Sequence, residues 1–499
     1  MLRRCSWLFI LSGLYPITTT NAADHGSTSL RDIFLNAKNQ WSNETIVSFP
    51  SEEAFANATV RWNTYGAPSY SVAVSPADEV DVVKVVKLAV ENSISFLATG
   101  GRHGYGTGLG ELHKGLAIDL SQLKEVSVDP KAATLTIGPG AHFSDILPPV
   151  QRSGLQLQVG GCSCPSVIGL TIGGGVGRYQ GVYGLVTDAL LSVRLVTSRG
   201  DLVNVSSTSQ PDLFWGLRGA GANFGIITSA TYKLNQPVNG GRITSVDFIF
   251  RAELNSSYFD ILESFNNKMP AKLSIGSDIA YNSTTGQPEI QATWIYFGTE
   301  REARAAMASV FSLDYSVAIV NEISWDQIFT VPSFGVDALF CQPNSIHDMY
   351  SINLRNLSGS TFKSTFTKMA RFYNENPNTR SSIVIFETFP NQAMQAVPNA
   401  ATAYPWRDAT GYVQLMFGWQ DGDKDAETAS NAFGKELRND FVSTSGYPNL
   451  SVYVNYGHGD ESVEQVYGAS KLPRLAALKR TWDPENIFRY NFPIPTLYP

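Results

Sequence analysis

The sequence predicts an α+β protein of two or more domains, and three observations lead to this fold class. Its 499 residues are too many for one ordinary hydrophobic core. From about residue 60 to 235, short strands, brief helices and glycine turns alternate. From about residue 240 to 450, glycine clusters thin out, and aromatic-rich strands alternate with longer polar helices. A linker is expected between the two regions, at residues 235–241.

The first region is expected to open with a helix. Ser75 is the expected N-cap and Pro76 the first helical residue, with an acidic residue in the first turn. Valines then recur at helical spacing and predict one buried stripe. These are Val80, Val83, Val86 and Val90. Strands are expected at Ile94–Ala98, Leu116–Leu120, Thr134–Ile137, Leu191–Thr197 and Ile226–Leu234. Later elements are helices at Glu302–Phe311 and Lys471–Thr481, and an aromatic strand that starts at Tyr453.

The N-terminus predicts export from the cell. Arg3 and Arg4 precede the apolar run Trp7–Leu14, and small residues follow up to Ala22, so residues 1–22 are expected to be a signal peptide. Seven N-x-S/T sequons spread along the chain suit a secreted glycoprotein. They begin at Asn43, Asn57, Asn204, Asn255, Asn282, Asn356 and Asn449.

Charge and cysteine content exclude several classes of protein. The net charge of −7 and the lack of a basic run argue against nucleic acid as a partner. No later stretch reaches about 18 uninterrupted apolar residues, so no membrane span is expected. Without the signal peptide three cysteines remain, Cys162, Cys164 and Cys341, and this odd number leaves at least one thiol unpaired. A lone C-x-C has no second ligand pair, so no metal site is expected.

Three glycine-rich segments are the strongest candidates for a functional site. They are Thr99–Gly108 (TGGRHGYGTG), Gly160–Leu185 with its C-x-C and triple glycine, and Pro211–Thr228. Glycines let backbone N–H groups approach a phosphate closely and adopt positive φ. None fits G-x-G-x-x-G, because Leu109 stands where the third glycine would follow Gly104 and Gly106, so a Rossmann-bound nicotinamide is disfavoured.

Together these segments resemble the FAD-binding domain of the vanillyl-alcohol-oxidase (PCMH-type) superfamily. The segment Tyr453–Pro493 resembles the C-terminal segment of berberine-bridge-enzyme-like oxidoreductases. The resemblance implies an α+β, two-subdomain FAD-binding domain at 60–237 and a substrate domain at 240–450. That second domain would place an antiparallel sheet over the flavin. Residues 451–499 would return to the FAD domain.

The resemblance also implies which residues bind FAD. His103 corresponds to the family's covalent attachment point for the flavin 8α-methyl group, and a structural histidine is the alternative. Cys162 fits the position of a second attachment, at flavin C6, by its distance to the triple glycine, whereas Cys164 fits it by its following proline. A flavin with one link is the other alternative. The remaining expected contacts are Gly100, Gly101, Arg102, Gly104, Tyr105, Gly106, Gly169, Gly173, Gly174, Gly175, Gly177, Asn223, Gly225 and Ile227.

The catalytic expectation rests on Tyr453-Val454-Asn455-Tyr456. Relatives commonly use a tyrosine of this segment as general base, which implies Tyr456 first and Tyr453 second. A free tyrosine titrates near pH ~10, so its pKa would have to be lowered. The implied function is a secreted oxidase that passes hydride from a small organic substrate to FAD and then to O₂, in a tailoring step of fungal-type secondary metabolism. A carbohydrate oxidase is the alternative, and a non-catalytic flavin-binding protein is a third.

Overall fold

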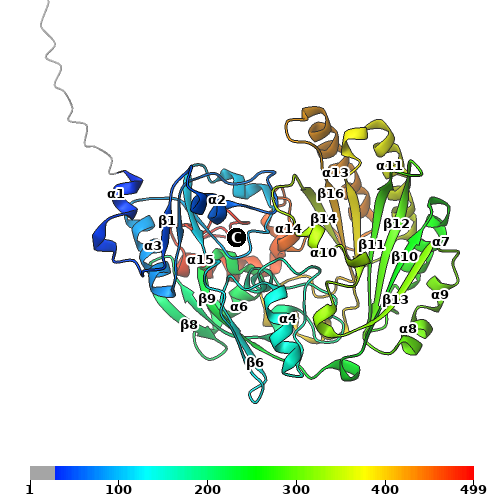
Figure 1. Ribbon diagram of the computed structural model, residues 1–499, viewed down its shortest axis with the longest axis horizontal. Helices are drawn as coiled ribbons and strands as arrows, with labels where there is room; N and C mark the ends of the chain where they lie inside the picture. The colour runs from blue at the N-terminus through cyan, green and yellow to red at the C-terminus, as the bar shows by residue number, and fades with distance from the viewer. Residues whose placement is uncertain (1–28) are drawn as a thin grey trace, which may run out of the picture.

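The computed structural model describes residues 29–499, so the expected signal peptide and Cys5 lie outside the described residues. The chain forms two lobes (Figure 1). The first lobe consists of residues 29–241 and 451–499, and the second lobe of residues 243–444. None of the helices in this described part of the chain has the length and apolar character needed to span a bilayer.

Two sheets build the first lobe. In the first sheet, β2, β4 and β3 run parallel and β1 adds an antiparallel edge; the order is β1 (Ile46–Ser48), β2 (Tyr70–Ser75), β4 (Gly115–Asp119), β3 (Phe96–Thr99). The second sheet is antiparallel, in the order β5 (Val126–Asp129), β6 (Thr134–Ile137), β9 (Ile226–Lys233), β7 (Leu190–Val196), β8 (Leu202–Ser206). Because β1 belongs here, the lobe includes chain before residue 60. The α+β class is confirmed.

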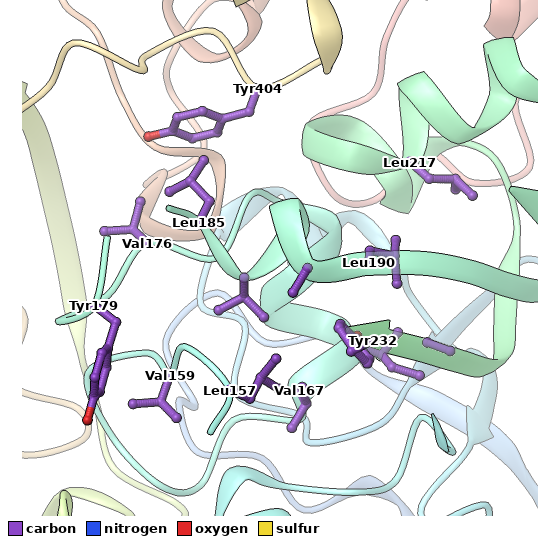
Figure 2. Close-up of a cluster of buried hydrophobic side chains, with 14 of the residues drawn as sticks. Leu157, Val159, Val167, Val176, Tyr179, Leu185, Leu190, Leu217, Tyr232 and Tyr404 are labelled. Atoms are coloured by element: carbon purple, nitrogen blue, oxygen red, sulfur yellow. The ribbon is translucent and has the colours of Figure 1, made fainter. Parts of the chain in front are cut away.

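The helices of the first lobe cover these two sheets and join them to the C-terminal segment. They are α1 (Leu30–Phe34), α2 (Glu53–Thr59), α3 (Glu79–Glu91), α4 (Phe143–Arg152), α5 (Val167–Ile172), α6 (Pro211–Ala220), α14 (Val463–Tyr467) and α15 (Leu472–Trp482). Figure 2 shows the core between them, where Leu157, Val167 and Leu190 gather around Tyr232. The hydroxyl of Tyr232 donates to Thr171 at 3.0 Å, which satisfies the one polar atom it buries.

Helix α3 starts later than the sequence predicts, and it buries a different stripe. Its N-cap is Asp78, whose side chain accepts from the Asp81 N–H. Ser75 instead ends β2 and donates to Asp119 at 2.9 Å. The buried stripe is Val82, Val85, Val86 and Ala89, while Val80 and Val90 are 55% and 42% exposed. The valines of α3 lie on two adjacent faces of the helix. The face that packs against the sheet is the buried one.

The second lobe is a seven-stranded antiparallel sheet covered on its outer face by helices. Its order is β13 (Val317–Ile323), β10 (Ile243–Phe250), β12 (Gln287–Tyr296), β11 (Leu273–Asn282), β15 (Ile383–Thr388), β16 (Gly411–Phe417), β14 (Asp348–Leu354). Its helices are α7 (Asn255–Ser264), α8 (Glu300–Ala306), α9 (Ala308–Phe311), α10 (Asp337–Phe340), α11 (Gly359–Glu375), α12 (Gln392–Ala396) and α13 (Lys424–Thr444). Helices α7, α11 and α13 pack on the side away from the first lobe (Figure 1).

The period-two alternation of β15 shows how this sheet divides its side chains. Val384 and Phe386 point into the apolar core under the helices, whereas Ile385 and Glu387 face the first lobe. A buried carboxyl therefore lies on the inner face of the sheet.

The C-terminal segment packs on the first lobe. The expected aromatic strand is wrong, because residues Val454–Tyr456 form a short 3₁₀ turn. Helix α15 packs on α6. Asn223, buried beside both, accepts from the Ile494 N–H at 2.9 Å and donates to Tyr467 at 3.0 Å. These bonds fix the last residues against the loop after α6.

Candidate functional site

A cavity of about 500 Å³ runs through the first lobe and opens under the inner face of the seven-stranded sheet. Its lining combines three chain segments that the sequence analysis singled out, at 97–106, 161–173 and 219–227, with residues 453–457. The expected contacts that line it are Gly100, Gly101, Arg102, His103, Gly104, Tyr105, Gly106, Cys162, Gly169, Gly173, Gly225 and Ile227, with Tyr453 and Tyr456. The size and the glycine-rich lining fit a cofactor.

The glycines after β3 allow the chain to approach two neighbouring segments closely. A Cβ on Gly100 would lie 2.1 Å from the Pro139 carbonyl oxygen, and one on Gly101 would lie 2.6 Å from the Ser166 nitrogen. Arg102 follows with a φ of 52° and pairs with Asp119. Only residues without a side chain fit the first two positions, so the loop delivers His103 to the cavity.

His103 lies in a stack of rings. Its imidazole stacks on Trp62 with centroids 4.3 Å apart, and His347 stacks on Trp62 at 4.1 Å. The Nε2 atom is buried without a hydrogen-bond partner. Burial lowers the pKa of His103 to about 4, so the ring is neutral at physiological pH. A neutral imidazole has the free lone pair that covalent attachment requires.

The cysteines have separate roles. Cys164 and Cys341 form a disulfide, and Cys162 is the free thiol of the described chain. One ring nitrogen of His103 and the sulfurs of Cys162 and Cys164 lie within 4.8 Å of one another. Burial raises the pKa of Cys162 to about 12. Cys164 as a flavin attachment point is therefore wrong, since its sulfur is already bonded, and Cys162 remains.

Four further expected contacts do not line the cavity, because they serve packing. Gly174 and Gly175 have φ of 134° and 80°, and a Cβ on them would meet Tyr404 and Val186, each at 2.5 Å. A Cβ on Gly177 would lie 1.9 Å from the Val159 oxygen. The side-chain amide of Asn223 is hydrogen-bonded to Tyr467 and Ile494 of the C-terminal segment.

The two tyrosines of the C-terminal turn face different partners. The hydroxyl of Tyr453 accepts from the Gly175 N–H at 3.0 Å and from Asn455 Nδ2 at 2.6 Å, so it holds the triple-glycine backbone. The hydroxyl of Tyr456 donates to Glu387 Oε2 at 2.9 Å. Burial and the charge of Glu387 hold the pKa of Tyr456 well above its usual value. A free tyrosinate at this position is therefore disfavoured.

Glu387 is the functional candidate that the sequence analysis missed. It is 8% exposed, and burial raises its pKa to about 7. Asp278 on β11 lies on the same face of the sheet, and burial together with Glu387 raises its pKa to about 7 as well. The buried guanidinium of Arg178 faces both acids without an ion pair to either. The one available signal was a glutamate inside the apolar strand Ile383–Thr388.

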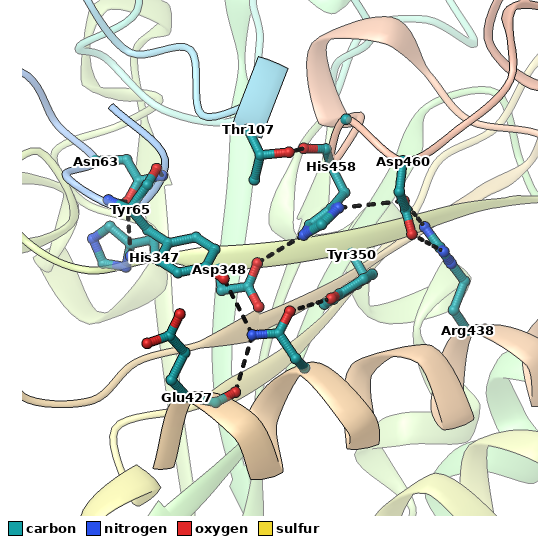
Figure 3. A network of polar contacts seen from close by, with 12 residues as sticks. Asn63, Tyr65, Thr107, His347, Asp348, Tyr350, Glu427, Arg438, His458 and Asp460 are labelled. Atoms are coloured by element: carbon teal, nitrogen blue, oxygen red, sulfur yellow. Dashed lines mark hydrogen bonds and ion pairs between the residues drawn. The ribbon is translucent and has the colours of Figure 1, made fainter. Parts of the chain in front are cut away.

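A second polar cluster connects the lobes beside the cavity (Figure 3). His458 Nε2 lies 3.0 Å from Asp348 Oδ1, and its Nδ1 lies 3.3 Å from Asp460, which Arg438 also binds at 2.6 Å. Burial alone would lower the pKa of His458, but hydrogen bonds to the two aspartates outweigh it and raise the pKa to about 9. The His458 carbonyl accepts from the Thr107 N–H at 2.7 Å. The cluster therefore couples the second lobe to the His103 loop.

This fold and site define a flavin-dependent oxidoreductase with two lobes. Residues 70–206 match the FAD binding domain family, and residues 452–495 match the berberine and berberine-like family. The FAD-linked oxidoreductase srdI of Neurospora crassa is 46% identical over 98% of this chain and 97% of its own length. The FAD-linked oxidoreductase OXR1 of Pyricularia oryzae is 47% identical over 94% of this chain and 93% of its own length. The chain belongs to the berberine-bridge-enzyme-like FAD-linked oxidoreductases.

Solved structures share the fold. BBE-like 1 of Physcomitrella patens matches with a TM-score of 0.79 and 21% identity, over 91% of this chain and 98% of that one. The xylooligosaccharide oxidase of Myceliophthora thermophila, in complex with xylobiose, matches with a TM-score of 0.76 and 22% identity, over 91% and 97%. The family match and the two fungal relatives show that the protein is an FAD-dependent oxidoreductase. They do not support the alternative of a non-catalytic flavin-binding protein.

Proposed function

We propose that this protein is a secreted oxidase that removes hydride from a small organic substrate in a tailoring step of fungal-type secondary metabolism. The observation that carries the proposal is the hydrogen bond from Tyr456 to Glu387 on the wall of the cavity. It provides a proton-accepting pair at the surface where a substrate would lie. When bound, FAD supplies the acceptor for the hydride.

The proton from the substrate passes through this pair. A substrate hydroxyl donates to Tyr456 Oη while the tyrosine proton moves to Glu387 Oε2, so Tyr456 stays neutral throughout. The balance of the two pKa values supports this route, because the pKa of Glu387 is about 7 whereas that of Tyr456 is held far above its usual value. Tyr453 accepts from the Gly175 N–H, and Asn455 donates to Tyr453 and to the Leu170 carbonyl, so both residues position the turn.

His103 and Cys162 would hold the flavin covalently. A neutral buried imidazole and a free thiol lie close together at one end of the lining. The glucooligosaccharide oxidase of Acremonium strictum, a structural neighbour, carries a 6-S-cysteinyl, 8α-N1-histidyl FAD. The same pair of residue types occurs here, which supports two links.

The substrate proposal rests on side chains that line the cavity. Phe329, Phe334, Phe340, Met349 and Met416 give it a largely apolar wall, which suits a compact metabolite. A carbohydrate oxidase is the second candidate, because Asp278, Gln291 and Gln414 place polar groups on the sheet face. Structural neighbours that oxidise oligosaccharides support that alternative.

The exposure of most sequon asparagines supports secretion and glycosylation. Five of the seven sequon asparagines, Asn43, Asn57, Asn204, Asn356 and Asn449, have exposed side chains. The Cys164–Cys341 disulfide is also typical of an oxidising compartment. A mobility shift of the secreted protein after endoglycosidase treatment would support this, whereas an unshifted intracellular protein would contradict it.

Peroxide release on a panel of aromatic alcohols and reducing sugars tests the reaction and the substrate together. Release with an aromatic alcohol supports the metabolite oxidase, and release with sugars alone supports the carbohydrate oxidase. Substrate-dependent bleaching of the flavin without peroxide would show that O₂ is not the acceptor. Glu387→Gln is the control, because it removes the proton acceptor and leaves the cavity lining the same size.

A further inference from the structure

The chain between β13 and β14 forms one side of the cavity and crosses to the first lobe. We call residues 333–345 the wall segment. Ser333, Phe334, Val336, Asp337 and Phe340 of this segment all line the cavity. In Figure 1 its helix α10 lies between the first lobe and the seven-stranded sheet.

Both ends of the wall segment are fixed by hydrogen bonds. At the start, the carboxylate of Asp247 accepts from the backbone N–H groups of Ser333 and Phe334 at 2.9 and 3.1 Å. At the end, the Asn344 N–H donates to the Arg61 carbonyl at 2.8 Å. Nine residues (335–343) therefore lie between the anchors Phe334 and Asn344.

The middle of the wall segment has no buried helical residue to hold it in place. Helix α10 has four residues, and none of them is buried. The side chain of Leu339 is 70% exposed and that of Phe340 is 40% exposed. A single helical turn without a buried face is not stable by itself in water. Other contacts must hold α10 against the cavity.

Three contacts hold it, and one is covalent. Asp337 accepts from the Ser163 N–H at 3.1 Å and from the Ser163 hydroxyl. Trp62 Nε1 donates to the Phe340 carbonyl at 2.6 Å. Cys341 is bonded to Cys164, two residues after the free thiol Cys162. All three join α10 to the first lobe, on the side where His103 lies.

We propose that the Cys164–Cys341 disulfide is a latch that holds α10 over the cavity and thereby restricts the site to compact substrates. Exposed hydrogen bonds open readily in a segment with few apolar contacts. A disulfide, in contrast, breaks only by reduction or by exchange with a thiol. With the latch closed, Val336 and Phe340 stay in the cavity wall, and a long substrate has no room to pass them. Cys164 and Cys341 are thus positioning residues. This inference deepens the proposed function, since it selects compact metabolites over sugar oligomers.

The test uses the flavin-loaded, full-length protein with Cys164 and Cys341 both changed to Ser. Changing both leaves no new thiol to compete with Cys162. Amide hydrogen exchange over residues 335–343 is expected to rise by about tenfold or more, while the amides bound to Asp247 keep their protection. Leu339→Ala is the matched control, because it lies on the same helix but outside the cavity lining.

Ligand binding supplies the second readout, and it does not depend on turnover. The Kd of 4-hydroxybenzyl alcohol and that of cellotriose are measured from the change in flavin absorption in the Glu387→Gln background, in which flavin reduction by turnover is slowed. The double variant is expected to improve cellotriose binding relative to the alcohol by about tenfold. Ser163→Ala keeps the disulfide and removes one hydrogen bond. It should change the amide exchange and the Kd ratio in the same direction as the double variant, but by a smaller factor.

Two outcomes would overturn the latch. Unchanged exchange and an unchanged Kd ratio in the double variant would show that the disulfide does not hold the wall. Loss of covalent flavin from an acid-precipitated pellet would show that it acts on cofactor attachment instead. Peroxide release by the wild-type protein is measured separately, so a failure of the oxidase proposal is distinguishable from a failure of the latch.

Discussion

The hydroxyl of Tyr456 donates a 2.9 Å hydrogen bond to Oε2 of Glu387, across the boundary between the C-terminal segment and the second lobe. The two residues are 69 positions apart in the chain. Burial raises the pKa of Glu387 to about 7, and the hydrogen bond from Tyr456 acts against this rise. The carboxyl of this pair therefore titrates near neutral pH, and its pH behaviour can be tested.

Glu387→Gln is expected to lower kcat by about 10²-fold or more, because it removes the final proton acceptor. In the wild-type protein kcat/KM should rise with pH through about 7, since the carboxyl must lose its proton before it accepts one. The variant should lose this rise. Asp278 has a similarly raised pKa, so Asp278→Asn is the matched control. If Asp278→Asn removes the rise and Glu387→Gln keeps it, the assignment to Glu387 is wrong.

Tyr456→Phe is expected to lower kcat by a similar factor of about 10² and to move the rise in kcat/KM to higher pH. The shift follows because a hydrogen bond to a carboxylate favours its charged form, and the variant lacks that bond. A pH profile of both kinetic constants measures the shift. An unmoved profile with full activity would contradict the proton route through Tyr456.

His103→Ala and Cys162→Ala should each remove one covalent flavin link. Mass spectrometry after proteolysis identifies the peptides bonded to the flavin and so counts the links, and a yellow acid-precipitated pellet shows that at least one remains. The double variant His103→Ala, Cys162→Ala should release all its flavin to the supernatant. The double variant Cys164→Ser, Cys341→Ser is the matched control and should keep both links, because it removes the disulfide and leaves no new thiol. Loss of a link in this control would contradict the assignment to Cys162.

The His458 cluster should make the stability of the protein fall at alkaline pH. Hydrogen bonds to Asp348 and Asp460 raise the pKa of His458 in the folded chain to about 9, above the ordinary value of 6.5. Its contribution is thus fully present below about pH 6.5 and is lost as the pH rises through about 9. Thermal unfolding of the wild-type protein should show a falling Tm across this window.

Asp348→Asn should reduce that fall, because it removes one of the two carboxylates that stabilise the imidazolium. Glu427→Gln is the control, because Glu427 lies on α13 like Arg438 but pairs with Lys424 and not with His458, and it should leave the slope unchanged. A wild-type Tm that stays constant from pH 6.5 to 9 would show that His458 does not carry the charge.

The local chemistry of the first lobe could be read from the sequence. Positions such as Gly100 and Gly101 must be glycine because the backbone of another segment lies against them. This requirement is visible in the sequence as a glycine motif. The strand Thr134–Ile137 was predicted at its observed bounds, and four more lay within two residues of theirs. His103 and Cys162 were singled out by the same motifs.

Contacts between residues that are far apart in the chain could be identified only from the tertiary structure. Glu387 became a candidate only when the alternation of β15 and the order of the sheet placed it against Tyr456. The sequence favoured Cys162 as the second flavin attachment point and kept Cys164 as the alternative, and the pairing of Cys164 with Cys341, 177 residues away, argues against that alternative. Local motifs record constraints within a few residues, whereas the contact between two distant residues depends on how every intervening element packs. The sequence by itself therefore determined the family, the cofactor and the glycine loops. Only the tertiary structure showed that Glu387 is hydrogen-bonded to Tyr456 and that Cys164 is bonded to Cys341, because both contacts join distant parts of the chain.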